Sequence, residues 1–310
     1  MLRWMRRRWR ARSRFAGAAR LGRRLAVLGI AYAAAAFTAA CANLPKDRDS
    51  RAEGVVWQVD NATARPVGDW QLLGVRRLLI QWTAVDDTAF IPDAGLPAAA
   101  NMPDWARIGR EPWAADVIVG LAGYADEKRA RGNVEKLVRI SAQLARASSS
   151  LPLHITGYYF PVEVDPTWAD APKLGSLMSA LPRPLWISVY DRTNIGGKML
   201  ADWLASWLPP DVGVFFQDGC GVYARGPEVA REYVEALSAK LGGERVRVIA
   251  EAFRPSEHGG FRAATADELR AQLAAYSGYS AYLFDGPHYV SSELTRALAP
   301  RAARRERGTP

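Results

Sequence analysis

Short apolar segments recur along the chain and alternate with segments of helical periodicity. From residue 54 onward there are eight such runs, rich in valine, isoleucine, leucine and aromatic residues. They span residues 54–60, 77–83, 116–121, 155–163, 185–190, 212–218, 246–253 and 281–285. Their starts are about 22 to 40 residues apart, which leaves room for a crossover helix between successive parallel strands. Near-continuous apolarity is typical of strands covered on both faces, as in a parallel sheet.

The segments between these runs carry helical patterns and helix-end signals. The clearest helical patterns span residues 134–147, 198–208, 227–241 and 266–276. Pro227 suits a first helical position, and Gly242 and Gly243 suit a helix end. Thr265 and Glu268 have the spacing of a capping box. We therefore expect one helix over each of the four patterns.

The repeats and the length of the chain together predict the fold. Eight strand–helix repeats within 310 residues favour an α/β fold, a (β/α)8 TIM barrel, over residues 54–300. A doubly wound open sheet is the alternative, but no GxGxxG or P-loop motif follows the first predicted strand. The long insertion at residues 84–113 follows the second strand. Because loops after barrel strands surround the active site, we expect this insertion to wall a cleft.

Charge is distributed very unevenly. The formal net charge is +9, yet residues 1–24 alone contain ten arginines and no acidic residue. The other 31 basic groups nearly balance the 32 acidic groups, so the rest of the chain, here called the body, is close to neutral. We therefore expect no nucleic-acid partner. A composition of 49% hydrophobic residues supports a large core. Two cysteines exclude a disulfide scaffold, and three histidines argue against a histidine-rich metal site, so we expect no metal and no cofactor.

The N-terminus has the pattern of an export signal. The arginine-rich stretch precedes the uncharged apolar run at residues 25–40, which is shorter than a comfortable membrane span. Residues 38–41 resemble a bacterial lipobox, so we predict a signal peptide over 1–41 with lipidation at Cys41, a linker over 42–53 and a charged tail over 301–310. The alternatives are cleavage at a small-x-small site around Cys41, twin-arginine export through Arg23 and Arg24, or an uncleaved anchor. Each predicts an exported body, in the periplasm and possibly held at the membrane by a lipid anchor.

Candidate catalytic groups lie where the predicted strands end, as in barrel enzymes generally. Glu163 ends the fourth strand and Glu251 lies near the end of the seventh, each after strongly apolar sequence. Burial favours the neutral carboxyl form, which suits acid catalysis. A proton donor and a nucleophile, both carboxyl groups, are what glycosidic bond cleavage needs. Candidates for binding a substrate at the other strand ends are Gln58, Asp60, Gln81, Trp82, Gln217, Asp218 and Asp285.

Several of these segments resemble known families. Glutamates at the ends of strands four and seven resemble the largest clan of retaining TIM-barrel glycosidases. The segments GYYFPVE, WISVYD, FFQDGCGV and AEAF are similar to an uncharacterised bacterial glycosidase-like family, domain of unknown function 4434, over residues 54–289. The resemblance implies that Glu163 is the general acid/base and Glu251 the nucleophile. It also implies sugar-stacking walls formed by Trp57, Trp82, Tyr158, Tyr159, Tyr190, Tyr223 and Tyr289.

Two positions qualify this resemblance. The clan usually has asparagine before the strand-four glutamate, where this chain has Val162. The hydrogen bond of that asparagine is worth about 1–3 kcal/mol in the transition state, and Gln217 and Gln58 are the candidates to replace it. Tyr158 and Tyr159 point to opposite faces of one strand, so at most one faces the barrel interior.

The sequence thus predicts a glycoside hydrolase, retaining if active, that acts on a bacterial or extracellular polysaccharide. The first alternative is a barrel that binds glycan without cutting it, as part of an exopolysaccharide system. The second is a metal-dependent hydrolase with an all-carboxylate site formed by Asp60, Glu163 and Asp218. The chain has no HxH or HExxH spacing, which disfavours this second alternative.

Overall fold

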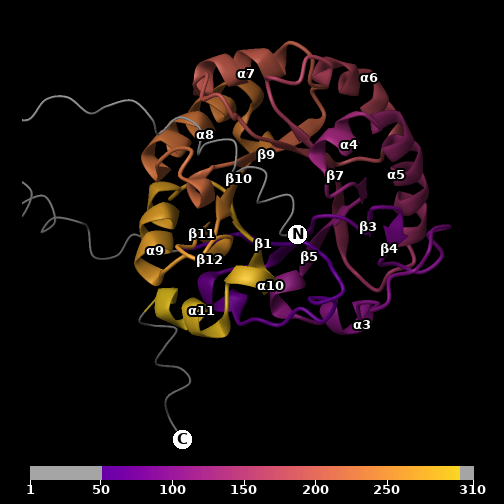
Figure 1. Cartoon of the computed structure of the whole chain (residues 1–310), viewed down its shortest axis with the longest axis horizontal. Helices are drawn as coiled ribbons and strands as arrows, with labels where there is room; N and C mark the ends of the chain where they lie inside the picture. Colours follow the sequence, from indigo (N-terminus) through magenta and orange to yellow (C-terminus); the bar gives the residue numbers. More distant parts are fainter. Residues whose placement is uncertain (1–50, 301–310) are drawn as a thin grey trace, which may run out of the picture.

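The structure, a computed structural model, describes residues 51–300 and contains a closed barrel of eight parallel strands (Figure 1). The barrel strands are β1 (Gly54–Trp57), β2 (Arg77–Ile80), β5 (Asp116–Gly120), β7 (Ile155–Val164), β8 (Leu185–Val189), β9 (Val212–Gln217), β10 (Val246–Glu251) and β13 (Ala281–Phe284). They neighbour one another in chain order, and β13 closes the barrel against β1. The predicted (β/α)8 fold is confirmed, and the closed sheet excludes the open doubly wound alternative. The predicted signal segment with Cys41, the linker up to residue 50 and the tail at 301–310 lie outside the described residues.

Helices surround the barrel on its outside (Figure 1). They are α3 (Trp105–Ile108), α4 (Glu127–Arg131), α5 (Val134–Ser148), α6 (Leu174–Leu177), α7 (Gly197–Ala205), α8 (Pro227–Leu241), α9 (Ala266–Ala275), α10 (Gly286–Tyr289) and α11 (Ser292–Leu298). Single 3-10 turns are η2 (Trp70–Leu73), η3 (Pro112–Ala114), η4 (Ala171–Lys173), η5 (Met178–Ala180), η6 (Cys220–Val222) and η7 (Gly243–Arg245). The four expected helices are α5, α7, α8 and α9. Both hydrogen bonds of the Thr265–Glu268 capping box are present, and Pro227 lies in the first turn of α8.

The first two crossovers lack the long helix that the repeat pattern predicts. The β1–β2 connection contains only η2, and the β2–β5 connection contains only the four-residue α3 and the turn η3. Prolines at positions 92, 97 and 103 interrupt the second of these segments, and proline removes a helix hydrogen bond and clashes with the preceding turn. Part of this insertion instead forms β3 (Ala84–Val85) and β4 (Thr88–Ala89), which join β6 (Ala122–Gly123) in a small sheet.

Strand side chains alternate between two cores. One set packs against the helices, and the other fills the barrel interior, where the buried side chains are Val56, Leu79, Ile118, Tyr159, Phe215, Ile249, Tyr282 and Phe284. Phe215 lies at the centre of the interior, with ring centroids 4.9 Å from Tyr282 and 5.9 Å from Tyr159. Tyr158 packs instead on the helix side, so only one of the tyrosine pair faces inward. The interior below the strand ends is therefore filled with aromatic and aliphatic side chains.

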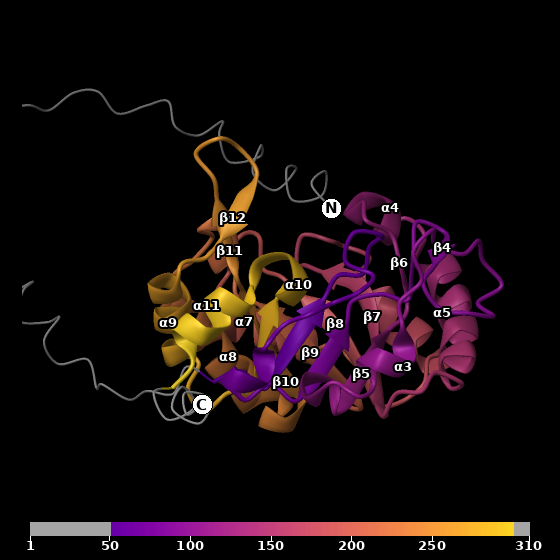
Figure 2. The same ribbon diagram turned by 90° about the horizontal axis from the view of Figure 1, so that it is seen from below.

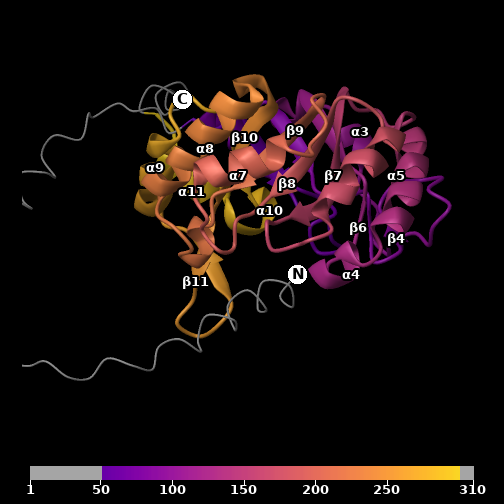
Figure 3. The ribbon, with the colours of Figure 1, turned by 90° about the horizontal axis from the view of Figure 1, so that it is seen from above.

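The segments that follow the strands gather at one end of the barrel. Figures 2 and 3 show α4, α10 and the hairpin of β11 (Phe253–Pro255) and β12 (Phe261–Ala263) at this same end. This is the end at which barrel enzymes carry their active sites. Between residues 51 and 300, no helix combines the length and the apolar character needed to cross a membrane.

Candidate active site

A cavity of about 150 Å³ lies at the C-terminal mouth of the barrel. Its polar lining consists of Asp60, Asp86, Glu127, Glu163, Ser188, Gln58, Gln81 and Gln217, and its aromatic lining includes Trp82, Tyr124, Tyr159 and Phe284. Val85 and Asp86 come from the insertion after the second strand, as expected of a segment that walls a cleft. Of the predicted site residues, the cavity brings together Gln58, Asp60, Gln81, Trp82, Tyr159, Glu163 and Gln217. The predicted residues that do not line it are Glu251, Trp57, Tyr158, Tyr190, Asp218, Tyr223, Asp285 and Tyr289.

Glu163 reaches the cavity because of the alternation along β7. Tyr159, Pro161 and Glu163 face inward, whereas Phe160 and Val162 belong to the core between strands and helices. Only 6% of Glu163 is exposed, and its Oε2 accepts a hydrogen bond of 2.7 Å from Gln217 Nε2. Val162, which stands where the glycosidase clan has asparagine, therefore faces away from the cavity. Gln217, at the end of β9, places its amide beside Glu163.

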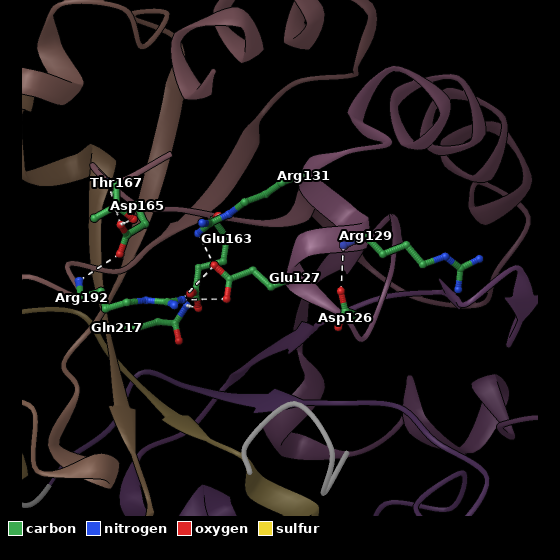
Figure 4. Close-up of polar contacts among 9 residues, drawn as sticks. All are labelled: Asp126, Glu127, Arg129, Arg131, Glu163, Asp165, Thr167, Arg192 and Gln217. Carbon is green, nitrogen blue, oxygen red and sulfur yellow. Dashed lines mark hydrogen bonds and ion pairs between the residues drawn. The ribbon is translucent and has the colours of Figure 1, made fainter. Parts of the chain in front are cut away.

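The backbone of Glu163 is held by a network from α4 (Figure 4). Arg131 donates from Nε and Nη2 to the carbonyl oxygen of Glu163, at 3.2 and 3.1 Å, and also pairs with Glu127. Arg192 Nη2 donates to both carboxylate oxygens of Glu127, at 3.1 and 2.9 Å. The backbone N–H of Arg192 donates to Asp165 Oδ2 at 2.9 Å, which fixes the chain just beyond β7. The network thus fixes the end of the strand that carries Glu163.

Sequence reasoning did not identify Glu127 or Arg131 as site residues. Their spacing of four residues is a signal for a helical ion pair, and Asp126 is a helix N-cap whose carboxylate accepts from Arg129 N at 2.8 Å. Such a pair is more often a surface feature than a site feature. Only the fold shows that α4 lies against the end of β7.

Two amide side chains offer acceptors inside the cavity. Gln58 Oε1 and Gln81 Oε1 are buried and have no hydrogen-bond partner among residues 51–300. A buried polar atom without a partner costs about 1–3 kcal/mol, so a ligand hydroxyl that donates to it would recover that cost. The indole of Trp82 donates to the carbonyl of Val59 at 2.8 Å, which fixes the ring in the cavity wall. Amide acceptors beside a fixed aromatic ring suit a polyhydroxylated ligand.

A histidine lies between two carboxylates at one side of the mouth. His288 Nδ1 is 2.6 Å from Oδ2 of Asp285, and His288 Nε2 is 3.3 Å from Oδ2 of Asp60. Burial alone would lower the pKa of His288, but the hydrogen bonds to Asp285 and Asp60 raise this pKa to about 9. Burial raises the pKa of Asp285 to about 6, although His288 opposes the shift. For Asp60, burial is outweighed by hydrogen bonds from His288 and Thr63, and its pKa falls to about 2.

These shifts predict how stability changes with pH. The raised pKa of His288 stabilises the folded state fully below its unfolded value of 6.5, and this contribution is lost as the pH rises to about 9. Because the imidazole is partly accessible, we expect the free energy of unfolding to fall by about 1–2 kcal/mol across this window. Asp285 and Asp60 titrate below it. Urea unfolding at both ends of the window measures the change.

The double variant His288→Gln/Asp285→Asn should remove most of this pH dependence, because neither side chain then titrates. His288→Gln alone would not, because loss of the imidazolium lets burial raise the pKa of Asp285 further. His154→Gln is the matched control, since His154 is exposed and pairs with Asp116 at the opposite end of the barrel. An equal loss of stability with pH in the wild type and in this double variant would contradict the assignment.

Glu251 is placed differently from Glu163. It lies on the inward side of β10 but is only 2% exposed, and its Oε2 accepts a hydrogen bond of 2.8 Å from the backbone N–H of Gly221 in η6. A Cβ atom at Gly221 would lie 2.9 Å from Cβ of Glu251 and 2.6 Å from the ring of Phe253. Only glycine therefore allows η6 to lie so close over Glu251.

Asp218 points away from the cavity. Because Gln217 faces the barrel interior, the next residue of the strand faces the helix layer. Asp218 is fully buried there and accepts hydrogen bonds from Tyr276 Oη at 2.8 Å, from the backbone N–H of Cys220 at 3.0 Å and from the side chain of Gln272. Burial raises the pKa of Asp218. The sequence prediction placed Asp218 in the site, and the structure makes it part of the packing between β9 and α9.

This placement makes a stability prediction. Tyr276→Phe removes a donor to Asp218 and should destabilise the protein by about 1–3 kcal/mol, as expected for a buried hydrogen bond to a charged group. Ligand binding in the cavity should be unchanged. Tyr279→Phe, at the more exposed end of the same segment, is the control and should cost less than about 0.5 kcal/mol. Equal stability of the two variants in urea unfolding would contradict a structural role for Asp218.

The remaining predicted residues lie around the cavity rather than in it. Tyr190 is buried, with the guanidinium carbon of Arg225 5.4 Å from its ring centroid. The ring of Tyr289 packs against Phe253 at 5.3 Å. Asp285 is fully buried beneath His288. Within the described part of the chain, no group of three or more histidine, cysteine, aspartate or glutamate side chains is arranged to hold a metal ion.

Comparison with known proteins identifies the fold. No protein-family model matches the chain, and no curated protein matches it. Among solved structures, the chain is similar to one from Bacteroides thetaiotaomicron VPI-5482 described as a "putative alpha-L-fucosidase". The TM-score is 0.54 and the identity 14%, over 90% of this chain and 95% of that chain. At this identity the likeness shows a shared barrel fold. The resemblance to domain of unknown function 4434 stays a prediction.

Proposed function

We propose that this protein is a glycoside hydrolase whose cavity binds a polysaccharide or oligosaccharide. The observation that carries the proposal is the position of Glu163, a nearly buried carboxyl group in a cavity also lined by three amides and by Trp82. Burial of a carboxyl group that still faces a ligand is what a general acid needs. The fold shared with a protein described as a fucosidase and the resemblance to the glycosidase clan support the same class of reaction.

In this proposal Glu163 donates a proton to the oxygen of the scissile glycosidic bond as that bond breaks. Gln217 orients the carboxyl group through its hydrogen bond to Oε2. Glu251 attacks the anomeric carbon, and water then releases the sugar with Glu163 acting as base, which retains the anomeric configuration. Because η6 lies over Glu251, this second role requires Gly221 and its neighbours to move aside when substrate binds.

The burial of Glu251 favours a second candidate function. A carboxylate that accepts a backbone hydrogen bond and does not line the cavity does not have the placement of a nucleophile. In that case the cavity would bind glycan through Glu163, the amides and Trp82 without cleaving it. This is the function of a glycan-binding barrel in an exopolysaccharide system.

The test is a panel of aryl glycosides and bacterial polysaccharides, with α-L-fucosides included. The proposed function predicts release of aryl alcohol or reducing sugar from at least one of them, and loss of that release in Glu163→Gln. Glycan binding without release, in the wild type as in the variant, would instead establish the binding barrel. Absence of both release and binding across the panel would contradict both functions.

We also propose that the body is exported and anchored through a lipid on Cys41. The arginine-rich segment, the apolar run at 25–40 and the small residues before Cys41 support this. Mass spectrometry of the membrane fraction should find the mature chain beginning at a lipid-modified Cys41. A soluble chain that begins at another residue would contradict the anchor.

A further inference from the structure

The side chains of Asp285, His288 and Asp60 form a hydrogen-bonded relay from the buried core to the cavity. The proposed acid and nucleophile do not use this relay. Asp285 is fully buried at the end of β13, His288 lies in α10, and Asp60 follows β1 and lines the cavity. Three segments that are far apart in the sequence therefore place an acid, a base and an acid in line.

Asp285 requires a positive charge beside it. Its Oδ2 accepts from the backbone N–H of Gln58 at 3.3 Å and contacts His288, while its Oδ1 has no hydrogen-bond partner among residues 51–300. An ionised carboxylate in such a place is costly unless a cation pairs with it. An asparagine would fill the same volume without that cost. The buried carboxylate is therefore best explained by its effect on His288.

His288 can satisfy both neighbours only when it is charged. Neutral imidazole has one N–H and can donate to one carboxylate, whereas the imidazolium donates from both nitrogens. The contacts at 2.6 Å and 3.3 Å thus need the protonated form, which agrees with the raised pKa of His288. The two arginines of the neighbouring hairpin have other partners, because Arg262 binds Glu268 and Arg254 donates to Gln272.

Asp60 presents one oxygen to the cavity and uses the other to fix itself. Its Oδ1 accepts three hydrogen bonds, from the backbone N–H groups of Ala62 and Thr63 and from the hydroxyl of Thr63, at 2.8–2.9 Å. These bonds fix the plane of the carboxylate. The other oxygen, Oδ2, faces His288, and the side chain is 36% exposed where it lines the cavity. An ionised, fixed oxygen at a cavity mouth is a strong acceptor for a ligand hydroxyl.

We propose that His288, held by Asp285, is a positioning residue that fixes Asp60 as the hydroxyl acceptor at the cavity mouth, so that Asp60 binds a sugar hydroxyl group. This inference rests on the proposed carbohydrate ligand. It adds Asp60, which follows β1, and His288, which follows β13, as a specificity element beside Glu163 on β7 and Gln217 on β9. A ligand lacking a hydroxyl group at the position facing Asp60 should bind more weakly, because the desolvated carboxylate is then left without its donor.

The first experiment needs no ligand. The chain has three histidines, so the imidazole resonances can be assigned with His154→Gln, His258→Gln and His288→Gln, and followed by NMR from neutral to alkaline pH. The Asp285–His288–Asp60 relay predicts that the pKa of His288 is about 9, above the ordinary histidine value of 6.5, and that Asp60→Asn lowers it. A His288 pKa at the ordinary value of 6.5, or one unchanged by Asp60→Asn, would overturn the relay.

The second experiment uses an aryl glycoside that the wild type hydrolyses. His288→Gln and Asp60→Asn should each raise KM by about 10- to 100-fold, the loss of one charge-assisted hydrogen bond, with a smaller change in kcat. Because His288 acts through Asp60, the double variant should be no worse than either single variant. In the wild type, KM should also rise above about pH 9, and in His288→Gln it should not.

The outcomes separate this inference from the proposed function. Additive losses in the double variant, or a normal KM in His288→Gln, would overturn the positioning role while leaving hydrolysis established. If the wild type hydrolyses no glycoside, the proposed function fails, and the NMR titration alone then decides whether the relay exists. His154→Gln should behave as the wild type in both experiments, since it lies at the opposite end of the barrel.

Discussion

Glu163→Gln should lower kcat for glycoside hydrolysis by about 10²- to 10⁴-fold, the usual contribution of a general acid. Glutamine has nearly the same size and can still contact Gln217, so the cavity should keep its shape and its affinity for glycan. The loss should depend on the leaving group. Dinitrophenolate leaves without protonation, so kcat/KM for a dinitrophenyl glycoside should fall far less than kcat/KM for an unactivated disaccharide. The kcat value falls for both, because Glu163 is also the base of the second step.

Glu111→Gln is the control for this variant, since Glu111 pairs with Arg107 on the surface, away from the cavity. It should leave kcat and KM unchanged. An equal loss of kcat/KM for both leaving groups would show that Glu163 is not the acid. Unchanged hydrolysis of the disaccharide would remove Glu163 from the mechanism.

Glu251→Ala should reduce hydrolysis by a similarly large factor if Glu251 is the nucleophile, because no glycosyl-enzyme intermediate can then form. Removing this side chain leaves a space that a small anion can enter. Azide should therefore restore cleavage of a dinitrophenyl glycoside and yield a glycosyl azide of inverted configuration. The measurement is the initial rate with and without azide, together with the configuration of the product by NMR.

Gly221→Ala tests the same role without changing any carboxyl group. The added Cβ cannot fit beside Glu251 and Phe253, so η6 must shift and the hydrogen bond to Oε2 is disturbed. We expect kcat to change more than glycan binding, because the shift alters how Glu251 is held and Gly221 does not line the cavity. Hydrolysis that survives both Glu251→Ala and Gly221→Ala would exclude Glu251 as the nucleophile. If the wild type binds glycan without cleaving it, and neither variant loses that binding, the result would support the glycan-binding barrel.

The sequence was sufficient to predict the barrel because its strands are short, apolar and regularly spaced. Each of the eight barrel strands begins at the predicted residue, since burial on both faces leaves a run that contrasts sharply with its flanks. The prediction of a long helix in each of the first two crossovers was wrong. Their length is that of a helical connection, and proline within the second prevented one from forming.

The site could be predicted only in part, because the direction of a side chain depends on register. Both Gln217 and Asp218 were predicted to bind substrate, although neighbouring strand residues face opposite ways and the sequence does not say which of the two faces the cavity. The pairing of strands decides this, and it turns Gln217 inward and Asp218 toward Tyr276. Glu127 was not identified as a site residue because its partner Arg192 is distant in the sequence.

The position of a bound glycan shows whether Glu163 lies where a general acid must lie. The measurement is a crystal structure of Glu163→Gln, which should bind without cleaving, in complex with the oligosaccharide identified by the panel. We expect a sugar ring against Trp82. Its glycosidic oxygen should lie within hydrogen-bond reach, about 2.6–3.2 Å, of the side chain at position 163. A glycan bound elsewhere on the surface, with the cavity beside Gln217 unoccupied, would contradict it.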